Sequence, residues 1–329
     1  MKIRTRTLPA LLALILSMAA TLASRPAMAG DNGHFDRTLA VTGAVDLDVQ
    51  TGAGEITVRA GDSGKVEIHG RIDANHGWLT ADAEQRIREI EANPPIEQSG
   101  NTIRIGHIEN PGWRNGISIS YELVVPVQTK LHCESGSGDQ VVDGIVGPVD
   151  ANSGSGGVRL MNIAGETHVR TGSGDIELTA IHGAARATAG SGGIRATGIA
   201  GGLTASSGSG SVKLEQTAAG DVEIGTGSGD VEIKVAQGAV KVQTGSGSIT
   251  AQGDPTGDWR LHTGSGDVSV EVPQQAAFNL VARTSSGNID SSREITIQGK
   301  ASPRELQGKV GGGGPTLDLS TSSGNIQIR

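Results

Sequence analysis

Four aspartates are the residues whose type and spacing most suggest a chemical role, because each directly follows a Gly-Ser-Gly triplet: Asp139, Asp175, Asp230 and Asp267. Carboxylates at glycine-rich corners bind calcium in exported β-rolls, where the signature is G-G-x-G-x-D on each nonapeptide half-turn. That signature does not occur in this chain. A calcium-stabilised β-roll is therefore an alternative interpretation rather than the first one.

The spacing of these aspartates also disfavours a shared calcium ion. No two of them follow successive triplets, because the triplets between them are followed by Gly157, Gly193, Ser211 and Ser248. If successive triplets stack like neighbouring strands, ~4.8 Å apart, the nearest carboxylates lie ~9.5 Å apart, whereas calcium ligands lie about 2.4 Å from the ion. We predict instead that these aspartates, and Asn288 in the same column, hydrogen-bond the backbone of their own turn.

The histidines and the single cysteine do not form a recognisable metal site either. His132, Cys133 and Glu134 are consecutive on an expected strand, where neighbouring residues point to opposite faces. Three other histidines fall at outward or turn positions of different repeats: His168, His182 and His262. Cys133 also has no second cysteine with which to form an intramolecular disulfide.

Catalytic signatures are missing from the sequence. It contains no G-x-S-x-G, H-E-x-x-H, P-loop or G-x-G-x-x-G motif, in spite of 51 glycines. A β-helical carbohydrate-active enzyme would need carboxylates, basic groups and usually aromatic platforms on adjacent repeats, and we identify no such cluster. We therefore predict that the protein is not an enzyme and has no catalytic, cofactor-binding or metal site; the carbohydrate-active β-helix is a second alternative.

The fold that positions these residues follows from the repeat. Close copies of TGSGDIEL (Thr171 to Leu178) recur at steps of 18 or 19 residues, and relaxed copies at Ser285 and Ser322 follow at steps of 21 and 37. A constant period of this length is typical of a solenoid. The full copies begin at Gly136, Gly154, Gly172, Gly190, Gly208, Gly227, Gly245 and Gly264.

Each repeat contains two short segments in which apolar residues alternate with polar ones. A period of two over so few residues indicates strands, and stacking of equivalent strands makes them parallel. The predicted fold class is all-β: a single-stranded parallel β-solenoid with ~18-residue rungs and a short helix in an N-terminal excursion. In the repeat from Gly172 the predicted inward residues are Ile176, Leu178, Ile181, Ala185, Ala187 and Ala189.

The remaining positions of the repeat have expected roles in the stack. Both glycines of the triplet should permit positive φ at a tight corner, and the Thr or Ser before it should hydrogen-bond along the solenoid axis. Outward charges should pair between neighbouring repeats as modest, exposed ion pairs. The two outward columns are Arg159, Glu177, Arg195, Lys213 and Glu232, and Glu223, Lys241 and Arg260.

The chain divides into three predicted segments. Residues 1–29 read as a signal peptide, with basic residues, an apolar run and the small-x-small pattern Ala27-Met28-Ala29, so that the mature chain begins at Gly30. Residues 30–130 form an N-terminal β region with a helix near 80–92 that caps the solenoid. Residues 131–329 are the solenoid, with an irregular C-terminal cap near 291–320. We also expect a local core in the N-terminal third, with a contact surface as the alternative, around the aromatic residues Phe35, Trp78, Trp113 and Tyr121.

The motif TGSGDIEL, the segment YELVVPVQTKLHCESGSGDQVV (Tyr121 to Val142) and the ending LDLSTSSGNIQIR together resemble a bacterial family of unknown function known as "putative adhesins". The resemblance covers nearly the whole chain after residue 29. It implies a parallel β-solenoid at the cell envelope and no established activity.

We accordingly expect an exported, periplasmic or extracellular, non-enzymatic scaffold or adhesion surface. Loss of four basic residues with the leader would leave 23 basic and 35 acidic residues, a formal charge of −12 in place of −8. So acidic a chain disfavours nucleic acid as a partner. The expected partner is an unknown protein or glycan of the envelope, or another copy of the chain, with no membrane insertion after signal cleavage.

Overall fold

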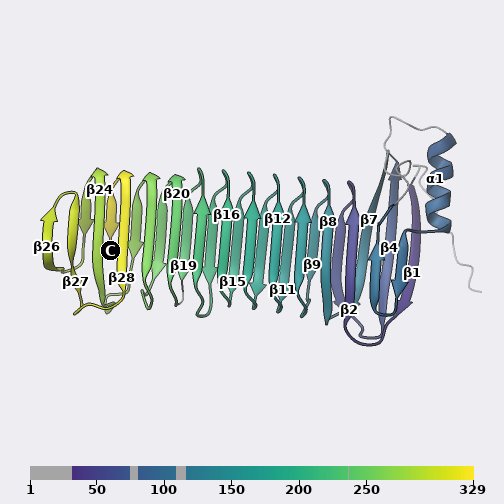
Figure 1. Cartoon of the computed structure of the whole chain (residues 1–329), viewed down its shortest axis with the longest axis horizontal. Helices are drawn as coiled ribbons and strands as arrows, with labels where there is room; N and C mark the ends of the chain where they lie inside the picture. The colour runs from purple at the N-terminus through teal and green to yellow at the C-terminus, as the bar shows by residue number, and fades with distance from the viewer. Residues whose placement is uncertain (1–31, 75–80, 109–115, 236) are drawn as a thin grey trace, which may run out of the picture. The chain divides into compact units, whose positions relative to one another are not determined.

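Alternating apolar and polar residues fold into strands over most of the chain. A computed structural model describes residues 32–74, 81–108, 116–235 and 237–329, in which 29 strands form two sheets and one helix lies near the N-terminal end (Figure 1). The predicted signal peptide and the predicted N-terminus at Gly30 lie outside the described residues. No helix of the described residues is long and apolar enough to cross a membrane.

In the repetitive part of the chain, from β7 to β25, successive strands alternate between the two sheets. Sheet A contains β1 (Asn32–Ala40), β3 (Ile56–Gly61), β4 (Lys65–Ala74), β7 (Ile117–Pro126), β9 (Gln140–Asp143), β11 (Val158–Ile163), β13 (Ile176–Ile181), β15 (Ile194–Ile199), β17 (Val212–Gln216), β19 (Val231–Val235), β21 (Ile249–Gly253), β23 (Val268–Glu271), β25 (Ile289–Ser291) and β29 (Ile326–Ile328).

Sheet B faces sheet A across the core. It contains β2 (Val45–Thr51), β5 (Ile96–Ser99), β6 (Thr102–Ile105), β8 (Thr129–Ser135), β10 (Val149–Ser153), β12 (Thr167–Thr171), β14 (Ala185–Ala189), β16 (Leu203–Ser207), β18 (Val222–Thr226), β20 (Val240–Ser246), β22 (Trp259–Ser265), β24 (Phe278–Ser286), β26 (Thr296–Ser302), β27 (Glu305–Val310) and β28 (Thr316–Ser323).

One coil of the solenoid is a sheet B strand, a Gly-Ser-Gly corner and the sheet A strand that follows. Successive coils pair in parallel with an offset of one repeat, as where Val149 pairs with Thr167 and Thr167 with Ala185. All six residues predicted to point inward in the repeat from Gly172, which lie on β13 and β14, are buried and belong to the core between the sheets. The predicted parallel β-solenoid is therefore confirmed.

The corner glycines are needed for a reason that differs from the predicted one. Positive φ occurs at the second glycine of late corners, as at Gly266 (φ 143°). Along most of the stack the demand is steric, because a Cβ on Gly174 would lie 2.1 Å from the carbonyl oxygen of Gly156 in the preceding corner. Backbones of neighbouring corners approach so closely that a side chain has no room.

The Thr and Ser column before the corners is confirmed as a hydrogen-bonded ladder. The buried Thr171 hydroxyl donates to the carbonyl oxygen of Gly156 in the preceding coil (3.0 Å) and accepts from the amide of Gly174 in its own corner (3.1 Å). Ser207 repeats both bonds with Gly192 and Gly210. Each hydroxyl thus satisfies two backbone groups that the turn removes from the sheets.

At the N-terminal end, an excursion covers the first coil. Strands β2 and β3 pair directly with β8 and β9, so they form the first coil of the stack, with its corner after Thr51. Between them the chain forms β4, helix α1 (Ala81–Ala92) and β5 to β7. The helix buries Ile87 and Ile90 beside β1. The buried rings of Phe35 and Tyr121 meet edge to face, 6.4 Å apart; Trp78 and Trp113 lie outside the described residues.

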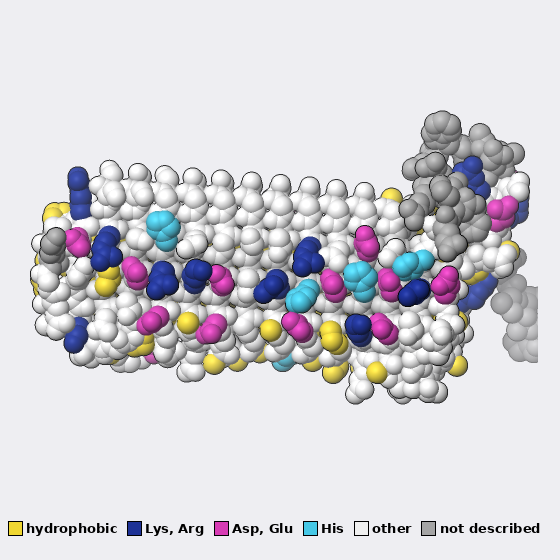
Figure 2. All heavy atoms as spheres, in the orientation of Figure 1, with side chains coloured by type: hydrophobic (Ala, Val, Ile, Leu, Met, Phe, Trp, Pro, Cys, Tyr) yellow, Lys and Arg dark blue, Asp and Glu magenta, His cyan; other side chains and the backbone are white. Residues whose placement is uncertain are grey.

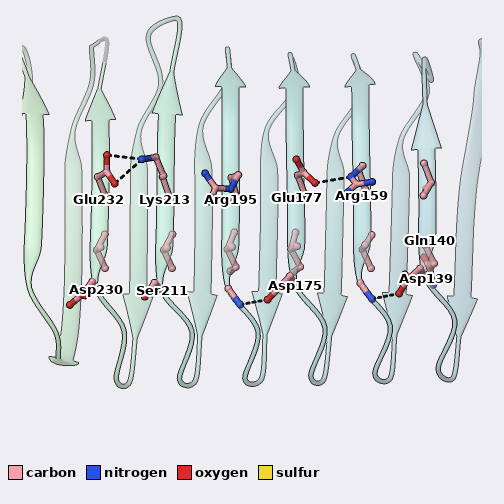
Figure 3. Close-up of a pocket in the computed structure, with 18 of the residues that line it drawn as sticks. Asp139, Gln140, Arg159, Asp175, Glu177, Arg195, Ser211, Lys213, Asp230 and Glu232 are labelled. Carbon is pink, nitrogen blue, oxygen red and sulfur yellow. Dashed lines mark hydrogen bonds and ion pairs between the residues drawn. The ribbon is translucent and has the colours of Figure 1, made fainter.

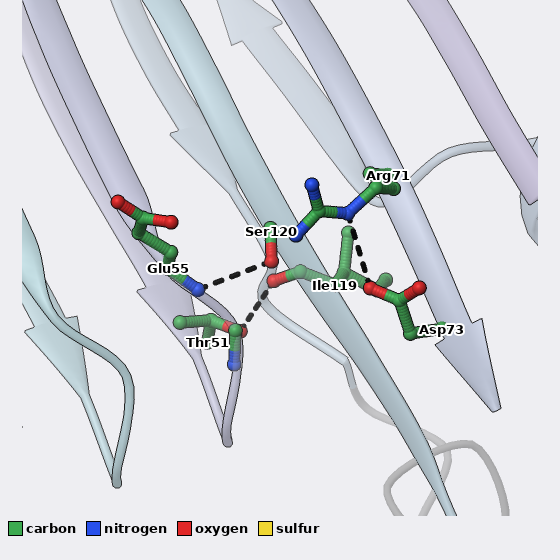
Figure 4. A network of polar contacts seen from close by, with 7 residues as sticks. Thr51, Glu55, Arg71, Asp73, Ile119 and Ser120 are labelled. Carbon is green, nitrogen blue, oxygen red and sulfur yellow. Dashed lines mark hydrogen bonds and ion pairs between the residues drawn. The ribbon is translucent and has the colours of Figure 1, made fainter. Parts of the chain in front are cut away.

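Polar contacts hold this excursion against the first corner (Figure 4). The Thr51 hydroxyl donates to the carbonyl oxygen of Ile119 (2.7 Å), and the Glu55 amide donates to the Ser120 hydroxyl (3.2 Å). Arg71 and Asp73 form an exposed ion pair on β4 nearby (3.2 Å). The first corner is therefore joined to β7 by the same kinds of bond that join later corners to one another.

At the C-terminal end, the order of coils differs from the order of the sequence. The last coil, β28 and β29, lies between the coil of β22 and β23 and the coil of β24 and β25. The antiparallel pair β26 and β27 then closes sheet B beyond β24. The predicted column in which Asn288 follows Asp267 is wrong for this reason, because Asn325 lies between them.

Candidate functional site

The outer face of sheet A carries a hollow of about 730 Å³ that runs over seven coils, from β9 to β21 (Figure 3). We call it the sheet A groove. Its two outward columns come from the period of two, which places every second residue of a strand on this face. They are Asp139, Gly157, Asp175, Gly193, Ser211, Asp230 and Ser248, and Val141, Arg159, Glu177, Arg195, Lys213, Glu232 and Thr250.

Four charges of the second column form ion pairs between neighbouring coils, as predicted. Arg159 Nε lies 2.7 Å from Glu177 Oε2, and Lys213 Nζ lies 2.8 Å from Glu232 Oε2. The hydrogen bond from Lys213 is the main cause that lowers the pKa of Glu232. All four side chains are about half exposed, so each pair contributes no more than ~1 kcal/mol to stability.

Arg195 occupies the middle of this column. Its strand places it beside Glu177 on one side and Lys213 on the other. Both of these neighbours are paired away from it, and Figure 3 shows the Arg195 guanidinium without a bond to the other labelled residues. Among the described residues Arg195 has no ion-pair partner within 4.0 Å. It is therefore a cation of the groove that can accept an external partner at little cost.

The aspartates of the first column bond across coils rather than within their own turn, so that prediction is wrong. Asp175 Oδ1 accepts from the amide of Gly193 in the next coil (2.8 Å), and Asp230 Oδ1 accepts from Ser248 (2.8 Å). Because the corners stack along the solenoid axis, the backbone amide of the equivalent residue in the next coil lies within reach of each carboxylate. Asn325 makes the same bond to Asn288 (3.0 Å). Each side chain caps a backbone donor.

The remaining sequence candidates are separated by the strand geometry. Cys133 is fully buried, and burial raises the pKa of its thiol, whereas His132 and Glu134 lie on the outer face. His132 Nδ1 lies 3.7 Å from Asp150, and His107 Nε2 lies 3.2 Å from Asp48. In the part of the chain that the structure describes, no three His, Cys, Asp or Glu side chains are grouped so that they could hold a metal ion.

Sheet B presents a second row of charge on its outer face, in which acids, bases and histidines alternate along successive coils (Figure 2). The predicted column of Glu223, Lys241 and Arg260 belongs to it. Lys241 Nζ lies 2.7 Å from Glu223, and Arg260 Nε lies 3.9 Å from Asp318 of the inserted last coil. Hydrogen bonding from Lys241 is the main cause that lowers the pKa of Glu223. The outer faces of both sheets therefore carry ion pairs between side chains of neighbouring coils.

A hollow of about 330 Å³ at the N-terminal end of sheet A gathers polar groups that the sequence did not reveal. Antiparallel pairing of β1, β4 and β7 brings together residues almost 90 positions apart. His69 Nδ1 lies 2.6 Å from Asp36 Oδ1, but both side chains are more than half exposed. No local motif could have marked this cluster. Its members are His34, Asp36, Glu55, His69, Arg71 and Glu122.

The sequence of residues 44–329 matches the family model Toastrack DUF4097. The chain belongs to this family. The family carries no established activity, and no curated protein matches the chain. The predicted family resemblance is confirmed, and with it the coarse expectation of a protein from a family of unknown function.

Six chains of solved structures match this member of the family, and three of them illustrate the similarity. A "putative lipid binding protein" from Parabacteroides distasonis ATCC 8503 is 13% identical, covers 90% of this chain and 97% of its own, and has a TM-score of 0.45. A "putative adhesin" from Bacteroides fragilis NCTC 9343 is 13% identical (90% and 97%, TM-score 0.30). A "putative cell adhesion protein" from Clostridium sporogenes ATCC 15579 is 10% identical (90% and 98%, TM-score 0.23).

Proposed function

We propose that the protein is an exported, non-enzymatic scaffold of the cell envelope that adheres to an extended glycan through the sheet A groove. The observation that carries this proposal is the groove itself, which presents two mostly polar columns over seven coils with the guanidinium of Arg195 at its middle. A surface of this kind suits a partner that is itself a repeating chain.

The chemistry of the groove favours contact over catalysis. Catalytic cleavage of a glycan requires a carboxyl group that holds a proton and donates it to the leaving oxygen. The carboxylates of Asp139, Asp175 and Asp230 instead accept bonds from backbone amides, and Glu177 and Glu232 are paired with cations. These groups still have lone pairs toward solvent, so they can accept hydrogen bonds from hydroxyl groups without giving up their structural bonds.

A glycan fits this surface better than a peptide strand. The strands below the groove pair on both sides, so a peptide would find no free sheet edge with which to pair. Small residues such as Gly157 and Gly193 leave room for a polymer that lies against the backbone. The groove carries five acidic and three basic side chains, which favours a neutral, hydroxyl-rich polymer over a polyanion.

Binding of the purified chain to fractionated envelope polysaccharides tests this function. Arg195→Ala should weaken binding about tenfold, which corresponds to about 1.4 kcal/mol. Arg186→Ala is the matched control, because Arg186 is an exposed arginine on the outer face of sheet B in the preceding strand. Equal effects of the two substitutions on binding would show that the glycan does not bind in the sheet A groove. Release of new reducing ends from the polysaccharide by the wild-type chain would instead support the carbohydrate-active enzyme.

The exported location has its own test. N-terminal sequencing of the protein recovered from the envelope should give Gly30 as the first residue, since Ala27 and Ala29 fit the small pockets of a signal peptidase. Recovery of the chain with Met1 in place would contradict removal of the leader.

A further inference from the structure

The last coil of the chain lies inside the stack and could be contributed by a second molecule. We propose that the slot between the coil of β22 and β23 and the coil of β24 and β25 is an exchange site. There the β28 and β29 coil of one chain is replaced by the same coil of another, which links two copies. This proposal is independent of the glycan-binding function.

The pairing of the last coil is complete on both sides. Leu317 and Leu319 of β28 pair with Trp259 and Leu261 of β22 on one side, and the same two residues pair with β24 on the other. In sheet A, β29 pairs with β23 and β25 in the same way. The two leucines and Ile326 are fully buried. Withdrawal of this coil therefore exposes two matched pairs of strand edges, which can be closed again by an identical coil.

The connection to the last coil is suited to act as a hinge. Residues 311–314 are four consecutive glycines, and three of them have positive φ: Gly311 (58°), Gly312 (92°) and Gly313 (90°). Glycine has the widest choice of backbone conformations, so this segment can point the coil back into its own molecule or away to another. Followed by Pro315, it leads from β27, the second strand from the end of sheet B, to β28.

Exchange would preserve the interactions of the native fold. The partner's coil would present the same side chains in the same register, so every backbone and core contact would be remade between chains. The balance between closed monomer and exchanged dimer is then set by protein concentration and by the hinge, as in domain swapping. A second copy of this chain is the one partner that supplies the complete match.

A disulfide between chains tests the exchange. His262 and Ser320 are paired outward residues of β22 and β28, and His262 Nδ1 lies 2.9 Å from Ser320 Oγ. In a Cys133→Ala background, one chain carries His262→Cys and a second, mass-tagged chain carries Ser320→Cys. Neither chain can close a disulfide alone, so a mixed disulfide reports the coil of one chain in the slot of the other. The two chains are unfolded together, refolded and oxidised.

A control mixture replaces His262→Cys by Gln243→Cys. Gln243 pairs with His262 and lies one coil further from Ser320, ~9.6 Å away and too far for a disulfide. We expect the mixed dimer from the first mixture to exceed that from the control at least fivefold. Deletion of Gly312 and Gly313 should increase it further, because a shortened hinge hinders return of the coil to its own molecule.

The double variant that carries both cysteines on one chain verifies the native register, since it should close within the chain. Equal yields of mixed dimer in the test and control mixtures, together with closure of the double variant, would overturn the proposal.

Discussion

Substitution of Gly174 by alanine tests the account of the corners most directly. Glycine is the third residue of every triplet from Gly54 to Gly324, whereas the first residue is serine at Ser285 and Ser322. A Cβ at residue 174 would lie 2.1 Å from the Gly156 oxygen and 2.4 Å from its carbon, where ordinary contacts begin at 3.4 Å. The corner must therefore move by more than 1 Å along a stack whose strands are ~4.8 Å apart.

The expected cost can be worked out from its parts. Overpacking of this kind costs about 1–3 kcal/mol. The movement also strains the hydrogen bond from the Thr171 hydroxyl to the Gly156 oxygen, which is worth ~1 kcal/mol. Alanine in place of glycine also lowers the conformational entropy of the unfolded chain, which stabilises the folded state by about 0.4–1 kcal/mol and offsets part of this cost. We expect Gly174→Ala to lower the free energy of unfolding by about 2–3 kcal/mol.

Urea unfolding followed by circular dichroism measures this cost, and Gly52→Ala is the control. Gly52 occupies the first corner, where an added Cβ meets nothing within 4 Å. That substitution should be neutral or stabilise by up to about 1 kcal/mol. If both variants unfold at the same urea concentration, the glycines are not required by the close approach of stacked corners, and the steric account is wrong.

Three further outcomes follow from the same contacts. Thr171→Val should cost about 2 kcal/mol because it leaves the Gly156 carbonyl and the Gly174 amide unpaired, whereas Thr188→Val, at an exposed position, should cost little in the same unfolding assay. Because folding lowers the pKa of Glu232, its ionised form stabilises the fold at pH values above 4.5, the ordinary pKa, and this contribution is lost as the pH falls through the folded pKa. The difference in unfolding free energy between wild type and Glu232→Gln should therefore be present at pH 7 and vanish at low pH. A difference that does not change with pH would contradict this prediction. Replacement of all four corner aspartates by asparagine should leave the melting temperature unchanged in either chelator or millimolar calcium, because Asn325 already makes the same bond. The four residues are Asp139, Asp175, Asp230 and Asp267. A calcium-dependent rise in the wild-type melting temperature that the variant lacks would instead support a calcium-stabilised β-roll.

The repetitive part of the fold was predictable because each repeat has the same neighbours. Once Ile176 and Leu178 are assigned inward, residues 18 positions away must be inward too, and the structure agrees along the whole stack. The helix at Ala81–Ala92 was predictable from its apolar spacing and its stop at Asn93-Pro94. Local pattern and tertiary position coincide in these elements.

Other features could not be read from the repeat because they depend on contacts between coils. Two examples are the hydrogen bond that the Gly193 amide donates to Asp175 and the clash that a Cβ on Gly174 would make. Both depend on the distance between one corner and the next, which the sequence does not state. The cluster around His69 arises from antiparallel strands that a parallel repeat does not predict. The step of 37 residues before Ser322 was visible, but a longer step can mean either an excursion or a return of the chain.

The position of the last coil also determines what an incomplete chain would lose. Residues 316–329 follow all the other described strands in sequence, yet they do not form the end of the stack. A product that stops before Thr316 lacks an inner course of both sheets, and the edges of β22, β23, β24 and β25 lose their partners together. In such a product either the slot between the two coils stays empty or the coil of β24 and β25 must pair directly with the coil of β22 and β23. Strand edges left unpaired by either outcome are accessible to proteases. Both sheets are thus continuous through the C-terminal coils only when residues 316–329 occupy this slot.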